Sequence, residues 1–170
     1  MNTGPHQRRG FSLAEVAMAS AVLAIGASAV LGVVGQVGAR RQETVSRATG
    51  MLLASELLAR IVSLPLADPQ TGVVSAGTDA GESSIAQFDD VTDFAGSIEP
   101  VILDAGGAAV AGMNGYSRSV TIEWLTDATG TAVSVSPTTA ARIVVVVQWR
   151  SKPVATLTTI RTVGWDGGKP

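Results

Sequence analysis

A long stretch near the start of the chain is apolar on every side. Residues 16–39 carry no formal charge, and their only clearly polar side chains are those of Ser20, Ser28 and Gln36. As an α-helix, these 24 residues span about 36 Å, which exceeds the roughly 30 Å hydrocarbon layer of a bilayer. The pattern therefore predicts a transmembrane helix.

The next stretch, residues 40–64, has the pattern of an amphipathic helix. It contains no proline and repeats apolar residues at helical spacing, at Val45, Ala48 and Leu52 and then at Leu53, Leu57, Ile61 and Leu64. Pro65 ends the pattern, because proline cannot donate the next backbone hydrogen bond. We expect one helix over residues 11–64, with a membrane-spanning part at 11–39 and an amphipathic continuation at 40–64.

The remainder, residues 65–170, is predicted to form a head around an antiparallel sheet. Glycine, aspartate and serine are frequent in residues 67–115, where only 98–103 has the pattern of a short strand, at an edge because of Pro100. Alternating residues at 116–124 and β-branched runs at 141–150 and 154–163 predict longer strands. The expected fold class is α+β, a long N-terminal helix packed on a C-terminal sheet of three or four strands.

Charge is unevenly distributed in this head. Residues 61–117 contain eight acidic residues and no lysine or arginine, whereas residues 118–170 contain six basic residues and three acidic ones. This asymmetry is typical either of complementary subunit surfaces or of solvated loops followed by strands edged with basic residues. Because the basic residues are scattered and the formal net charge is −2, we expect no nucleic-acid partner.

The composition also limits the chemistry. Cysteine is absent, and the sole histidine, His6, precedes the predicted folded part. The head therefore has no disulfide, no thiolate nucleophile and no histidine base, and the chain has no GxxxxGK phosphate-binding loop. We expect the protein not to be an enzyme. Trp124, Trp149 and Trp165 are expected to pack in the core or at sheet edges rather than to form a carbohydrate platform.

One group of acids is a candidate metal site. Asp89, Asp90 and Asp93, with Asp79 and Glu82 upstream, offer the oxygen ligands that Ca²⁺ prefers, although their spacing does not match an EF-hand. The alternative is a solvated acidic loop without an ion. No other cofactor is expected.

A single acid, Glu15, adjoins the apolar run and allows three interpretations. Ser12 and Glu15 have the spacing of a capping box, which would begin the helix of a signal anchor. The paired arginines at 8–9 are typical of a twin-arginine export signal, with small-residue cleavage sites at 19–21 and 27–29. Alternatively, cleavage before the apolar run leaves that run attached. The third interpretation best explains the acid, because a carboxylate in hydrocarbon is costly and is a functional candidate by default.

The residues of this third interpretation resemble a known family. Residues 9–15, RGFSLAE, followed by the apolar run, resemble the prepilin motif of type IV pilins and type II secretion pseudopilins. The resemblance implies a leader at residues 1–10, cleavage between Gly10 and Phe11 by a prepilin peptidase, and N-methylation of Phe11. It also implies that Glu15 pairs with the N-terminal amine of a neighbouring subunit.

By this resemblance, the chain is a filament subunit with a single pass through the cytoplasmic membrane and its C-terminal domain outside. Its partners would be the prepilin peptidase, other pilin or pseudopilin subunits, the membrane assembly platform and membrane lipid. The alternative is an exported soluble or membrane-anchored binding domain with an ordinary Sec or twin-arginine signal.

A second, shorter likeness concerns the head. Residues 87–96, QFDDVTDFAG, and the strand at 145–149 are similar to minor pilins of the mannose-sensitive haemagglutinin type. The disulfide-bounded C-terminal loop of many type IV pilins is missing, because the chain has no cysteine. These features favour a minor pilin or a pseudopilin over a major adhesive pilin.

Overall fold

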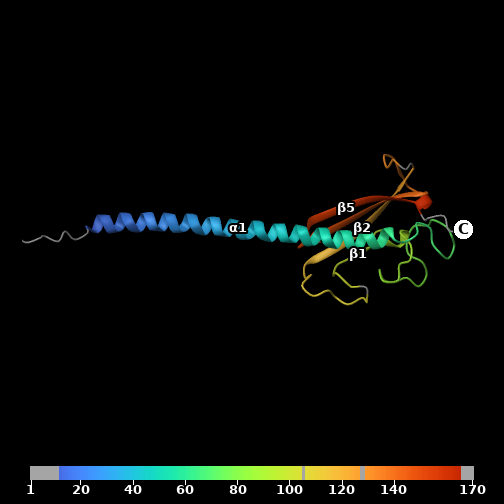
Figure 1. Ribbon diagram of the computed structural model, residues 1–170, viewed down its shortest axis with the longest axis horizontal. Helices are drawn as coiled ribbons and strands as arrows, with labels where there is room; N and C mark the ends of the chain where they lie inside the picture. The colour runs from blue at the N-terminus through green and yellow to red at the C-terminus, as the bar shows by residue number, and fades with distance from the viewer. Residues whose placement is uncertain (1–11, 105, 127–128, 166–170) are drawn as a thin grey trace, which may run out of the picture. The chain divides into compact units, whose positions relative to one another are not determined.

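The computed structural model describes residues 12–104, 106–126 and 129–165, whose elements are drawn in Figure 1. The chain divides into two compact units, residues 1–44 and 45–170. The expected leader and the predicted cleavage site at Gly10 and Phe11 lie outside the described residues.

The helix α1 spans Leu13–Val62, close to the predicted 11–64. Its C-terminal end tightens before Pro65: the amides of Ser63 and Leu64 donate to the carbonyls of Arg60 and Ile61, three residues back. This is the 3₁₀ geometry in which α-helices commonly end.

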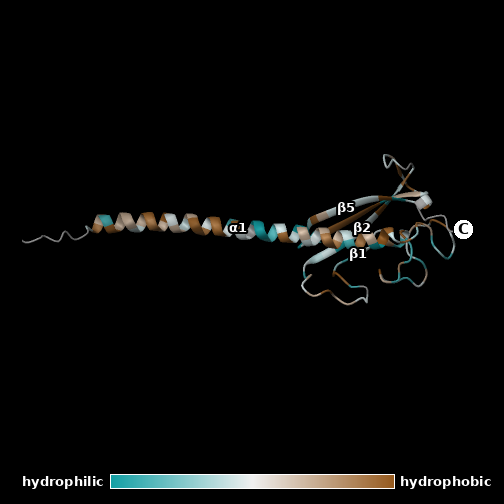
Figure 2. Cartoon of the chain, in the orientation of Figure 1, coloured by the Kyte–Doolittle hydropathy of each residue, from teal (hydrophilic) through white to brown (hydrophobic). Residues whose placement is uncertain are grey.

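In the first unit, α1 exposes its large apolar side chains. Figure 2 shows mainly apolar colours along this part of the helix, and they give way to a hydrophilic band, where the sequence reads Arg40-Arg41-Gln42-Glu43. By length and composition, α1 is the one described helix that could cross a membrane. The exposed large apolar residues of this unit are Leu13, Val16, Met18, Val22, Leu23, Ile25, Val30, Leu31, Val33, Val34 and Val37.

The second unit contains a five-stranded antiparallel sheet in the order β1-β2-β4-β5, with β3 also paired to β2. The strands are β1 (Ile98–Glu99), β2 (Tyr116–Leu125), β3 (Val133–Ser134), β4 (Ala140–Trp149) and β5 (Lys152–Thr162), and the 3₁₀ helices are η1 (Thr92–Phe94) and η2 (Val163–Trp165). The α+β class is confirmed. The predicted strand at 98–103 shortens to two residues before Pro100, which has no amide to donate to a ladder. The two-residue strand β3 was not predicted.

The C-terminal part of α1 packs against this sheet, but its buried face differs from the predicted one. Val45 and Leu52 were expected on the packed face and are instead 51% and 70% exposed; Ala48 is exposed as well. The residues that are buried there are Ser46, Gly50, Ala54, Leu57 and Ile61. Only the later half of the predicted stripe is therefore confirmed.

Small side chains explain this difference, because they allow a close approach of helix and sheet. A Cβ built on Gly50 would lie 2.6 Å from Cγ2 of Val154 in β5. Only glycine fits this contact without a shift of its neighbours. The hydrophobicity of a residue is thus a poor guide to burial at this end of the interface.

The central strand β4 supplies much of the core. Ala141, Ile143, Val145 and Val147 alternate along it and are fully buried, in one cluster with Leu57 and Ile61 of α1. The side chains between them are half-buried.

The tryptophans of the sheet pack as expected. Trp124 is buried, and Trp149 lies beside Tyr116 with ring centroids 6.4 Å apart and beneath the Arg150 guanidinium at 4.6 Å. The side chain of Trp165 is outside the described part of the structure.

A buried ion-pair network joins the helix to two strands. Nε of Arg118 in β2 donates to Oε2 of Glu99 in β1 at 2.5 Å, and its Nη1 donates to Glu56 of α1. Arg118 and Glu99 are both almost fully buried. Burial opposes the charged form, but the bonds to Glu99 and Glu56 raise the pKa of the Arg118 guanidinium above its ordinary value. The pairing offsets a burial that would otherwise be costly.

We predict that Gly50→Ala destabilises the second unit. The new Cβ would meet Val154, whose branched side chain is stiff, and overpacking of this kind costs about 1–3 kcal/mol. That cost exceeds the roughly 1 kcal/mol that alanine gains over glycine in a helix. Chemical denaturation of the detergent-solubilised chain, followed by tryptophan fluorescence, measures the change. In a double-mutant cycle, Val154→Ala should relieve the Gly50→Ala penalty, and independent, additive effects would contradict the close contact.

Candidate functional site

The start of α1 is a capping box. The amide of Ser12 donates to Oε2 of Glu15 at 2.8 Å, and the amide of Glu15 donates to Oγ of Ser12 at 3.2 Å. The two side chains thus satisfy backbone amides that the first turn of a helix leaves without partners. The negative charge also lies at the end of the helix dipole that favours it. The spacing of Ser12 and Glu15 in the sequence therefore corresponds to a capping box in the structure.

The residues next to Glu15 along α1 are nevertheless mostly apolar. Its neighbours Leu13, Val16 and Met18 are largely exposed, and residues 12–39 contain no lysine, arginine or histidine. A carboxylate in such a segment is costly inside hydrocarbon unless a cation compensates it. The described part of the first unit up to residue 39 provides no such cation.

The other polar side chains of this segment are suited to an apolar environment. Oγ of Ser20 donates to the carbonyl of Val16, and Oγ of Ser28 donates to that of Ala24, both at 2.8 Å. Hydroxyl groups bonded within their own helix leave few unmet polar contacts. Glu15 is therefore the one acidic residue in an otherwise uncharged run, residues 12–39.

Comparison with known proteins agrees with this reading of the N-terminus. Residues 5–31 match the family model described as the prokaryotic N-terminal methylation motif, and the match includes Gly10, Phe11 and Glu15. The chain carries a prepilin-type motif. No curated protein and no solved structure matches the chain.

This motif and the fold together support a pilin or pseudopilin subunit. The motif covers the N-terminal end, and the long apolar helix with its antiparallel sheet is a pilin-like α+β arrangement. Such a motif implies a structural subunit rather than an enzyme. The likeness of residues 87–96 to minor pilins of the mannose-sensitive haemagglutinin type finds no support in these comparisons.

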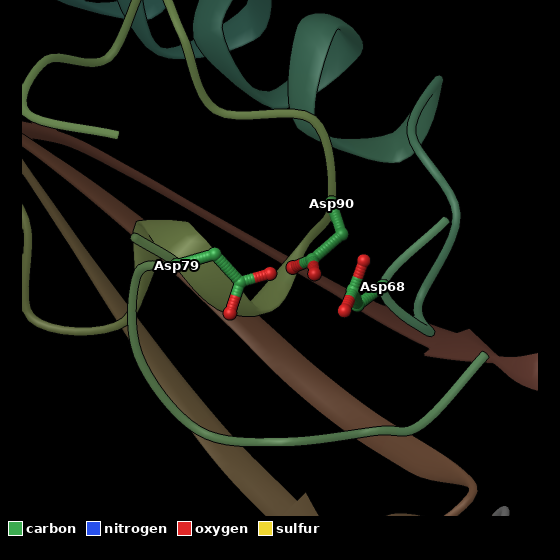
Figure 3. Close-up of side chains that lie close together, drawn as sticks. All are labelled: Asp68, Asp79 and Asp90. Atoms are coloured by element: carbon green, nitrogen blue, oxygen red, sulfur yellow. The ribbon is translucent and has the colours of Figure 1, made fainter. Parts of the chain in front are cut away.

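Six acidic residues between α1 and β1 form two groups of three. In the first group, Asp68, Asp79 and Asp90 converge with carboxylate oxygens within 4.8 Å of one another (Figure 3). Asp68 and Asp90 already accept hydrogen bonds within the loop. Asp68 accepts from the amide of Gln70 and the hydroxyl of Thr71, and Oδ1 of Asp90 accepts from the amides of residues 92 and 93.

The second group contains Glu82, Asp89 and Asp93, whose carboxylate oxygens also lie within 4.8 Å of one another. The predicted set of Asp89, Asp90 and Asp93 is thus divided between the two groups. Sequence reasoning missed Asp68, whose only signal is the turn-forming pair Asp68-Pro69 directly after the helix.

The crowding of these carboxyl groups changes their pKa values. Burial, followed by the neighbouring charge of Asp90 and the carboxyl of Glu82, raises the pKa of Asp93 to about 7. Burial likewise raises the pKa of Asp90, and burial with the charge of Asp68 raises that of Asp79. The hydrogen bond from Thr71 lowers the pKa of Asp68. Without a bound cation, the fold therefore favours the protonated forms of Asp79, Asp90 and Asp93.

We predict that the metal-free protein loses stability as the pH rises from about 4 to about 8. In the folded state Asp93 keeps its proton up to a pKa of about 7, whereas in the unfolded chain it loses that proton near 3.8. Folding therefore binds a proton in this window, and that contribution disappears as the pH passes the folded pKa. Denaturation in EDTA at several pH values measures it. Asp93→Asn should flatten the profile, and an equally steep profile in that variant would contradict the assignment.

Proposed function

We propose that the protein is a minor pilin or pseudopilin, a structural subunit that assembles into a type IV pilus or a type II secretion pseudopilus. The observation that carries this proposal is an acid at the start of an uncharged, uncovered apolar helix, within the matched motif. In a simple membrane anchor, the capping box would account for the position of that acid but not for its charge. A helix that packs against other helices through a specific ion pair accounts for the charge as well.

In this proposal the subunit first resides in the cytoplasmic membrane, with residues 1–10 in the cytoplasm and the head outside. The prepilin peptidase cuts between Gly10 and Phe11 and methylates the new amine of Phe11. The apolar run stays with the mature chain. Once an assembly platform extracts the subunit, the exposed side chains from Leu13 to Val37 pack against the helices of neighbouring subunits.

Glu15 then sets the register between subunits. The carboxylate that holds the Ser12 amide within its own chain also binds the N-terminal amine of a neighbour. Two opposite charges brought together in an apolar filament core compensate each other, whereas either one alone would be costly there. Only the processed chain has an amine at Phe11, so the same ion pair discriminates against unprocessed subunits.

We predict that the mature chain isolated from membranes begins at Phe11 and carries one extra methyl group on its amine. The expected mass is that of residues 11–170 plus one methylene, and N-terminal peptide mass spectrometry locates the modification. A Gly10→Val variant should retain the leader, because a branched side chain replaces the small residue at the cleaved bond. A mature chain that starts near Val22 or Val30 indicates an ordinary export signal instead. An unprocessed chain indicates a plain anchored domain.

We predict that Glu15→Gln inserts into the membrane normally and enters filaments at least about tenfold less than the unmodified chain. Glutamine keeps the capping box, since its amide oxygen still accepts from Ser12, but it removes the charge. Loss of one partner of a desolvated pair costs about 2–5 kcal/mol, more than a factor of ten. The measurement is the fraction of subunit recovered with sheared filaments relative to membranes.

The matched control for this experiment is Ser12→Ala. It removes the reciprocal cap at a cost of about 1 kcal/mol and leaves the charge of Glu15 in place. Incorporation should therefore persist in Ser12→Ala. Equal incorporation of Glu15→Gln and the unmodified chain would reject the ion pair, and equal loss in both variants would contradict a role that is specific to the charge of Glu15.

A further inference from the structure

In the second acidic group, Glu82, Asp89 and Asp93, the last residue is deeply buried and the other two are half-buried. Asp93 belongs to η1, between the fully buried Thr92 and Phe94, and is itself only 1% exposed. The Phe94 ring packs edge-on against Phe88 with centroids 4.9 Å apart. The position of Asp93 is therefore fixed by the hydrophobic core.

Two oxygens in this group lack the hydrogen-bond donors that burial demands. Oδ2 of Asp93 accepts from the amides of Asp89 and Asp90, and Oδ2 of Asp89 accepts from Nε2 of Gln70. The other oxygen of each carboxylate, Oδ1, is buried, and no donor among the described residues reaches it. Buried carboxylate oxygens without a donor or a cation are strongly disfavoured.

The two groups differ in this respect. In the first group, shown in Figure 3, neither Asp68 nor Asp90 has a buried oxygen without a partner. In the second group, two such oxygens lie in a cluster whose third member is Glu82, with carboxylate oxygens within 4.8 Å of one another. The buried carboxylate oxygens that lack a donor or a cation therefore belong to the second group.

We propose that Glu82, Asp89 and Asp93 bind one divalent cation of the calcium type. All three ligands are carboxylates on an irregular loop, which suits a hard cation that accepts six to eight oxygens in flexible geometry. Mg²⁺ demands a stricter octahedron, and Zn²⁺ is most often held by the histidine and cysteine ligands that the head lacks. This site is independent of the filament role of the helix.

The expected effect of the cation is to fix the loop on the sheet. Glu82 lies in the irregular segment between α1 and η1, whereas Asp93 is anchored in the core beside Phe94. A cation that joins these carboxylates ties the outer part of the loop to the folded head. Because it binds the native loop and not the unfolded chain, the ion adds to stability.

Calcium titration of the full chain tests the proposal. The purified chain in detergent is stripped with EDTA, titrated with CaCl₂ by calorimetry, and unfolded by heat with and without the ion. We expect one Ca²⁺ per chain, a saturable rise in Tm with Ca²⁺, and a smaller rise with MgCl₂. No heat of binding together with an unchanged Tm would overturn the proposal.

Two variants and a matched control locate the ion. Asp93→Asn and Glu82→Gln should weaken Ca²⁺ binding more than about tenfold and abolish the rise in Tm. Asp93→Asn is expected to fold, because its amide oxygen can accept from the same backbone amides and its NH₂ replaces the Oδ1 atom that lacks a donor. Asp79→Asn removes a charge from the first group, leaves all three proposed ligands in place and should still bind one Ca²⁺. Loss of binding in Asp79→Asn, or normal binding in Asp93→Asn, would overturn the assignment.

Discussion

The first part of α1 carries an apolar surface that its own unit does not bury. The placement of polar and charged residues along the helix depends on this constraint. The side chains from Leu13 to Val37 remain exposed, and they are too numerous for a soluble surface. Lipid or other helices must cover them. A single carboxylate, that of Glu15, is unfavourable in such an apolar environment. Its hydrogen bond from the Ser12 amide explains why an acceptor is at this position but not why the acceptor is charged.

The second part of the same helix buries its packed face against the sheet of its own chain. Ser46, Gly50 and Ala54 present small side chains, which bring the backbone close to β5, and the larger Leu57 and Ile61 then fill the core. A polar anchor supplements this packing, since Arg118 binds Glu56 of the helix and Glu99 of β1. One helix thus combines a surface for other molecules with a surface for its own sheet.

The sequence anticipates the periodic parts of this fold and misses those that depend on contacts distant along the chain. Helix limits, the strands β2, β4 and β5 and the capping spacing are visible because each follows from a local pattern. The buried face at Ser46 and Gly50 is not, since close packing of small residues leaves no hydrophobic signal. Likewise, Asp68 meets Asp79 and Asp90 only after an irregular loop has folded, and no periodicity reports where such a loop brings its side chains. The proposed filament role of Glu15 rests on a resemblance, and the residue lies within the matched motif.

The order of the elements along the chain also determines when the head can fold. The strands that cover Ala54, Leu57 and Ile61 lie mainly between residues 116 and 162, so the buried face of α1 has no partner until almost the entire chain has been synthesised. Contacts so distant in sequence form late, because the loop between them must first close. A chain that terminates before β5 therefore leaves an apolar helix face and an unpaired β4 edge exposed. An incomplete chain would thus expose the surfaces that favour aggregation and proteolysis.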